Sequence, residues 1–189
     1  MDLLKLDRQA LELNIDLIAG LTEEHLNMAT PCAGWTVLDV LQHQVDQTLA
    51  FAEGARGRST EVSLSMNGDP LGAYRNVAAQ VTDAFHASGL LARKIEFPGY
   101  GMQRGSIVVA AHFVDNLVHA WDLAKAIGID PTLDEEAATI ALGFAVKYPN
   151  DPTVRGPGAA FGEPVPVRDD APVTDRLVAL LGRSPSWPA

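Results

Sequence analysis

A stripe of polar residues runs along a segment that is otherwise apolar. Residues 106–127 read SIVVAAHFVDNLVHAWDLAKAI, in which His112, Asp115, His119 and Asp122 follow one another at spacings of three, four and three. At about 100° per residue, a helix places these four side chains within roughly 80° on one face. A helix this apolar is expected to be buried on most sides, where an unpartnered imidazole or carboxylate is costly. The stripe therefore requires a hydrogen-bond network, a metal ion or a water-filled cleft.

The remaining sequence predicts further helices around this one. Apolar residues recur every three or four positions in the range 2–19, and caps, an early proline, first-turn acids or a terminal glycine mark helices over 36–53, 70–87, 133–147 and 173–181. Thr36 and Asp39 form a capping-box-like start for the second of these helices. The range 91–102 alternates in part and is interrupted by proline and glycine, which predicts an extended connector or a small hairpin.

This pattern of elements predicts an all-α fold built on a bundle of four long helices. We expect residues 1–148 to form the bundle. Residues 149–189 form a C-terminal extension, with an irregular proline-rich part and one helix, that packs on the bundle within a single domain. The apolar residues Val154, Phe161, Val165 and Val167 favour packing over a free linker.

The charge of the chain narrows the classes of partner. It has 189 residues and a net charge of −10, with 14 Lys and Arg against 24 Asp and Glu and no basic cluster. These values argue against nucleic-acid and anionic-membrane partners. No apolar run reaches the ~20 residues of a membrane span, and the start of the chain does not resemble a signal peptide. The single cysteine, Cys32, cannot form an internal disulfide. We therefore expect a cytoplasmic protein.

Three residues are candidate metal ligands. Asp115 and His119 are four residues apart, so that one helix face can bring both to one ion. His43 lies among apolar neighbours in the second predicted helix, as an inward-facing residue would. Two imidazoles and one carboxylate suit zinc, and also nickel, manganese or iron. Spacing alone favours equally a buried polar network that binds no metal.

Several motifs resemble a known family. They are TPCAGWTVLDVLQH at residues 30–43, DNLVHAWDLA at 115–124, FGEPVPV at 161–167 and DRLVALLG at 175–182. Together they look like the actinobacterial-type proteins related to mycothiol-dependent maleylpyruvate isomerase, in the DinB-like superfamily. The resemblance implies a DinB-like four-helix bundle and a divalent metal held by His43, Asp115 and His119. The isomerase carries Glu where this chain has Asp115.

The resemblance also implies a metal-dependent enzyme acting on a small molecule with a low-molecular-weight thiol such as mycothiol or bacillithiol. A divalent ion stabilises a bound thiolate, which favours S-transfer or thiol-assisted isomerisation. His112 would be the catalytic acid or base, and a fourth metal ligand is the less favoured alternative for it. Whether the chain forms a homodimer stays open. The alternatives are a metal-dependent hydrolase, and a non-catalytic bundle that binds a small ligand or a partner.

Four other residues have two interpretations each. Asp122 could orient His119, although anchoring a backbone N–H or the loop near Trp35 is the favoured role. Cys32 is interpreted as structural rather than nucleophilic, because no basic neighbour is evident in the sequence. Trp35, like Trp121, could line a cofactor cleft or belong to the core.

Overall fold

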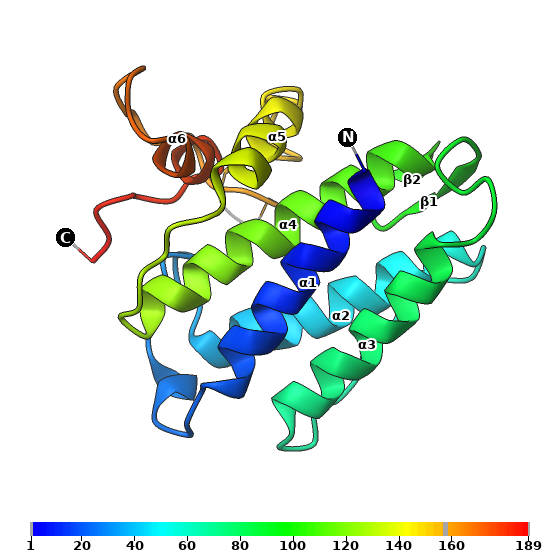
Figure 1. The fold of residues 1–189 in the computed structure, drawn as a ribbon, viewed down its shortest axis with the longest axis horizontal. Coiled ribbons are helices and arrows are strands. Elements are labelled where there is room, and N and C mark those ends of the chain that lie inside the picture. The colour runs from blue at the N-terminus through cyan, green and yellow to red at the C-terminus, as the bar shows by residue number, and fades with distance from the viewer. Residues whose placement is uncertain (1, 157–158, 189) are drawn as a thin grey trace.

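Four long helices form the body of the protein. The computed structural model describes residues 2–156 and 159–188. The bundle consists of α1 (Leu3–Ala19), α2 (Val37–Ala55), α3 (Pro70–Phe85) and α4 (Gly105–Ala126). Helix α1 packs mainly along α4 and α2 mainly along α3, and α2 also contacts α4 (Figure 1). This arrangement confirms the predicted all-α bundle and places α2 and α4 side by side.

Short polar side chains fix where these helices begin. The carboxylates of Asp2, Asp69 and Asp134 each accept a hydrogen bond from the backbone N–H three residues later. Helix α2 begins with a complete capping box: Asp39 donates its N–H to the Thr36 hydroxyl, and Thr36 donates its own N–H to the Asp39 carboxylate. The capping box expected at Thr36 is thus confirmed.

A small hairpin precedes α4. Strand β1 (Lys94–Phe97) pairs antiparallel with β2 (Gly101–Arg104), with Ile95 opposite Gln103. The hairpin lies tightly against the end of α2, where an added Cβ at Gly54 would lie 2.5 Å from the carbonyl oxygen of Glu96. Only glycine allows this approach. Of the two alternatives predicted for residues 91–102, the small hairpin is present, and its second strand extends to Arg104.

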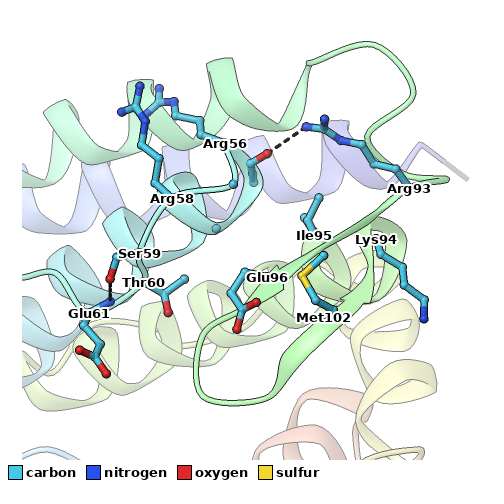
Figure 2. A pocket seen from close by; sticks show the side chains of 13 residues that line it. Arg56, Arg58, Ser59, Thr60, Glu61, Arg93, Lys94, Ile95, Glu96 and Met102 are labelled. Carbon is cyan, nitrogen blue, oxygen red and sulfur yellow. Dashed lines mark hydrogen bonds between the residues drawn. The ribbon is translucent and has the colours of Figure 1, made fainter.

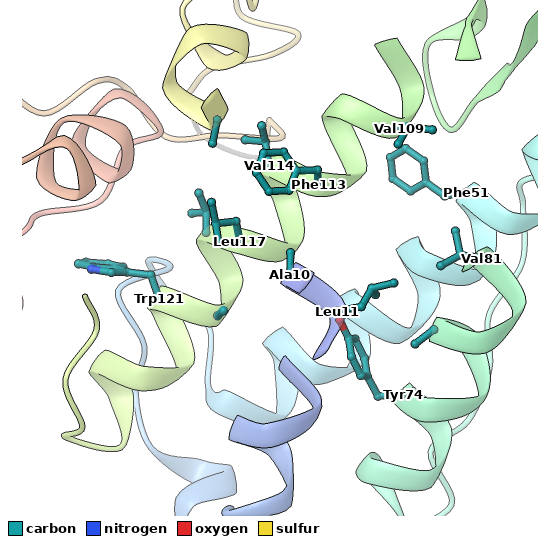
Figure 3. Close-up of a cluster of buried hydrophobic side chains, with 14 of the residues drawn as sticks. Ala10, Leu11, Phe51, Tyr74, Val81, Val109, Phe113, Val114, Leu117 and Trp121 are labelled. Carbon is teal, nitrogen blue, oxygen red and sulfur yellow. The ribbon is translucent and has the colours of Figure 1, made fainter. Parts of the chain in front are cut away.

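The core fills the space between the four helices. Figure 3 shows Leu11 of α1, Phe51 of α2 and Val81 of α3 gathered in one part of the core, with Phe113 beside Val114 on another face of α4, and all five are buried. Most of α4 is buried, as its apolar sequence predicts. Among the described residues, no helix combines the length and the apolar character needed to cross a membrane.

Two further helices follow α4, the second of them within the C-terminal segment, residues 149–189. Helix α5 (Glu135–Ala145) packs on α4, and α6 (Val173–Leu180) packs on α5. Between them Val154 is buried, the Phe161 ring stacks on Tyr148 at 5.5 Å, and the Val165 N–H bonds to α6. Val167 is exposed instead of packed. Residues 157–158 of the segment lie outside the described part, and the division of the chain at residue 148 stays a prediction.

Candidate metal centre

The loop before α2 positions Trp35 beside two histidines, His43 and His119. The N–H and the hydroxyl of Thr30 both donate to the Trp35 carbonyl at 3.0 Å, and the Trp35 N–H donates to Cys32 at 3.0 Å. The turn between them requires a positive φ, which Gly34 supplies at +80°. The Trp35 ring consequently lies against His43, with centroids 4.9 Å apart, and parallel to the His119 ring at 6.3 Å.

His43 of α2 meets Asp115 and His119 of α4. One ligand atom from each of the three residues lies within 4.8 Å of the other two. The Nε2 atom of His43 is 3.9 Å from one Asp115 oxygen, and the Nε2 atom of His119 is 3.6 Å from the other. This confirms that His43 faces the Asp115/His119 pair. We call these three residues the triad.

The donor atoms of the triad fit a divalent metal ion. Two imidazole nitrogens and a carboxylate are a common ligand set for zinc and related ions, with a position left open for water or substrate. With metal–ligand bonds of ~2.0–2.1 Å, ligand atoms around a tetrahedral ion lie about 3.3–3.5 Å apart. The observed separations of 3.6 and 3.9 Å involve the two different oxygens of Asp115, and the three ligand atoms as a set lie within 4.8 Å of one another, so the side chains would close by up to about 1 Å around an ion. The side chains of His43 and Asp115 are 26 % and 21 % exposed, which leaves the triad open to small molecules.

The local charges keep Asp115 ionised. Burial acts to raise the pKa of Asp115, but His119 and His43 outweigh it and hold that pKa well below its usual range. A carboxylate that stays anionic down to low pH is a ready ligand for a cation. The same negative charge, added to the effect of burial, raises the pKa of Tyr148.

The fourth and last residue of the stripe, Asp122, orients His119. One of its oxygens lies 2.9 Å from Nδ1 of His119, and its carboxylate also accepts from Arg183. The alternative of orienting His119 is thus observed. Of the favoured interpretation, a bond to a backbone N–H is not found among the described residues, and the loop near Trp35 is reached only through Arg183, which lies 3.5 Å from the Cys32 sulfur. Arg183 was missed because it lies 61 residues further along the chain.

His112 lies apart from the triad. Its side chain is fully buried, and Nδ1 is 2.6 Å from the carboxylate of Asp7 in α1. Its ring packs edge-on against Phe51 and Phe85 at about 5 Å. His112 and Asp122 stand at the two edges of the roughly 80° stripe, so the stripe divides between three neighbours. The first edge faces α1, the middle faces α2 and the last edge faces the C-terminal segment.

A polar network continues from His112 through the bundle. Asn116 donates to the His112 ring and carbonyl, accepts from the hydroxyl of Tyr74 at 2.6 Å, and receives a bond from Asn14 on its own carbonyl. The Gln44 amide group donates to Asn14, while its oxygen is buried without a described partner. The sequence analysis missed these residues, although Asn116 lies next to His112 on the surface of α4 and so widens the polar stripe on that side.

Cys32 has a basic neighbour that the sequence did not reveal. Its sulfur lies 3.5 Å from Nη2 of Arg183. Burial nevertheless outweighs the arginine and raises the pKa of the Cys32 thiol to about 11. The thiol therefore stays protonated at neutral pH, which is consistent with a structural role.

A cavity of about 590 Å³ lies at the C-terminal end of α2 (Figure 2). Its arginines already have partners: Arg56 and Arg58 bind Glu53, and Arg93 donates to the Ala55 carbonyl at 2.9 Å. None of the triad residues lines this cavity. The triad, unlike the lining of this cavity, brings together three side chains that can bind one metal ion, and we take the triad as the candidate site.

Comparison with known proteins identifies related sequences. A family model described as the mycothiol maleylpyruvate isomerase N-terminal domain matches residues 8–124, which include the whole triad. Two uncharacterized proteins, from two strains of Mycobacterium tuberculosis, are each 31 % identical over 185 residues, covering 97 % of this chain and 99 % of theirs. No solved structure shows a significant match to the chain.

Proposed function

The chain belongs to the mycothiol maleylpyruvate isomerase N-terminal domain family, and on that premise we propose that it is a metal-dependent enzyme that uses a low-molecular-weight thiol. The ligands would be His43, Asp115 and His119, and zinc is the ion we favour among zinc, nickel, manganese and iron. The thiol would be mycothiol or a related compound. It would react with a small electrophile by S-transfer or by thiol-assisted isomerisation.

The observation that carries this proposal is the convergence of the triad. Its three side chains come from two helices and direct three ligand atoms to one place, with His43 and Asp115 partly exposed. A purely structural network would be expected to bring these groups within hydrogen-bond distance, about 2.7–3.2 Å. The separations of 3.6 and 3.9 Å are too long for such bonds and suit an intervening ion instead.

The surroundings of the triad support binding of a substrate there. A divalent ion in such a site lowers the pKa of a bound thiol or water, which supplies the nucleophile. Trp35 offers an apolar aromatic surface beside His43, against which a substrate can pack. Asp122 holds His119 so that Nε2 faces the other ligands.

The acid–base role predicted for His112 stays a prediction. Its full burial and its bond to Asp7 support a structural role. The small-molecule substrate and the homodimer also stay predictions.

A conjugation assay tests the proposal. Purified protein loaded with zinc is incubated with mycothiol and an electrophilic dye, and the thioether is quantified with and without a chelator. We expect metal-dependent conjugation that His119→Ala abolishes and His86→Ala, an exposed change, leaves intact. Metal-dependent ester hydrolysis without conjugation would replace the transferase with a hydrolase. If the protein binds mycothiol but conjugates it to none of the electrophiles tested, the non-catalytic bundle is favoured.

A further inference from the structure

Arg183 reaches the candidate metal centre from the far end of the chain. It follows α6, and its side chain is only 5 % exposed. Its Nη2 donates to one Asp122 oxygen at 2.9 Å and its Nε to the other at 3.3 Å, while Nη1 donates to the Leu181 carbonyl at 2.8 Å. This two-pronged geometry is specific to the planar guanidinium group of arginine.

Both members of the Arg183–Asp122 ion pair are buried. The side chain of Asp122 is fully buried, and a buried carboxylate without a cation is strongly unfavourable. Each oxygen of Asp122 has a role: Oδ1 accepts from Arg183 alone among the described residues, and Oδ2 accepts from both Arg183 and His119. Arg183 thus fixes the position and direction of the group that binds His119.

The state of His119 follows from that bond. An ionised carboxylate only accepts hydrogen bonds, so the Nδ1 atom of His119 must carry a proton to bind Asp122. In the neutral ring Nε2 then holds the lone pair, and Nε2 is the nitrogen that lies 3.6 Å from Asp115. The tautomer that can bind a metal is therefore selected before any metal arrives.

We propose that Arg183 is a positioning residue of the metal centre, which acts through Asp122 and His119 to set its metal affinity. The inference rests on the metal site of the proposed function. It assigns a role in that site to a residue outside the range 8–124 that the family model matches. The same guanidinium lies 3.5 Å from Cys32, which links the loop that carries Trp35 to this unit.

Arg155 provides a matched control. It belongs to the same C-terminal segment, is 4 % exposed, and donates to the Leu180 carbonyl at 2.6 Å. Arg155→Met therefore removes a buried arginine anchored to the same end of α6, but one whose bond leads to the backbone instead of Asp122. Any general loosening of the C-terminal segment affects both variants.

The experiment measures two quantities in the full-length protein. Zinc affinity is obtained by competition with a chromophoric chelator, and the His119 tautomer is read from ring ¹⁵N chemical shifts of the metal-free protein. For Arg183→Met we expect the zinc Kd to rise about 10–100-fold and the Nδ1–H tautomer to lose its dominance. Arg183→Lys keeps the charge without the fork and should show a smaller loss. Arg155→Met should leave both quantities as in the wild type.

A double variant tests whether the effect passes through Asp122. Zinc affinity of Asp122→Asn/Arg183→Met should equal that of Asp122→Asn alone, because the two residues act in series. Additive losses, or a wild-type zinc Kd and tautomer in Arg183→Met, would overturn the inference. If Arg183→Met does not fold, Arg183→Lys replaces it in the same cycle. If the wild type binds no zinc, the proposed function fails, and the tautomer comparison alone decides the role of Arg183.

Discussion

Nδ1 of His112 lies 2.6 Å from Oδ1 of Asp7, although 105 residues separate them in the sequence. Both side chains are buried, one in α4 and the other in α1. The pair therefore joins the first and fourth helices of the bundle inside the core. Removal of one partner leaves the other as an uncompensated polar or charged group in an apolar environment.

The first prediction concerns the stability of this pair. His112→Ala should lower the free energy of unfolding by roughly 3–5 kcal/mol, because it leaves the Asp7 carboxylate buried without its partner. His86→Ala, an exposed change, should stay within about 0.5 kcal/mol of the wild type. Urea denaturation of metal-free protein measures both. A stable His112→Ala variant that has lost conjugation activity would instead favour the catalytic role.

The second prediction tests the contact between α2 and the hairpin. Gly54→Ala should destabilise the protein, because the new Cβ would lie 2.5 Å from the backbone oxygen of Glu96. Gly143→Ala is the matched control in α5, where an added Cβ meets no atom within 4 Å. It should stabilise by about 0.5–1 kcal/mol, since alanine loses less backbone entropy in a helix. Thermal melts of both variants give the signs. An unchanged melting temperature for Gly54→Ala would contradict the close approach.

The third prediction concerns the pH dependence of the α2 cap. Hydrogen bonds from the Thr36 hydroxyl and N–H lower the pKa of Asp39. A lowered pKa means that the stabilisation is present above about pH 4, the value for an unfolded chain, and is lost as the pH falls through the lower folded value. Thr36→Ala should cost about 1 kcal/mol at pH 7 and move the pKa of Asp39 toward its usual value. NMR titration of the Asp39 carboxylate checks the direction, and an unshifted titration would contradict it.

The fourth prediction uses the single cysteine. Because burial raises the pKa of the Cys32 thiol to about 11, its alkylation by iodoacetamide should be slow at pH 8 and still rise with pH above 9. In urea the rate should stop rising just above pH 8.5, because the ordinary cysteine pKa is about 8.5. The pH–rate profiles of native and unfolded protein are compared directly. A native profile that levels off at or below pH 8 would mean that Arg183 activates the thiol.

The helices and the hairpin could be predicted because their signals are local. The apolar period of α4 and the Thr36–Asp39 box are written in a few neighbouring residues. The approach of His43 to Asp115 and His119 was also predictable, because the spacing on α4 and the family resemblance point to the same residues. Local pattern thus covered the scaffold, and the triad followed from local spacing together with the family resemblance.

The sequence could not predict that the α4 stripe faces three different neighbours. A band of roughly 80° on a helix is wide enough to contact more than one packed element. Which edge meets Asp7 and which meets Arg183 depends on how the helices pack. Both partners are far from α4 in the sequence, at separations of 105 and 61 residues. Such pairings leave no periodic signal, so the spacing could not show that His112 binds Asp7 instead of facing the site.

The metal content and metal-dependent melting of the wild type and His119→Ala test the central claim most directly. We expect about one divalent ion per wild-type chain and a lower melting temperature after chelation, with a still-folded bundle. The metal should add about 2.7 kcal/mol at a free concentration of 100 times Kd. His119→Ala should lose this increment, and His112→Ala should keep most of it. A wild type with no bound ion and equal melting temperatures with and without zinc would contradict the metal centre.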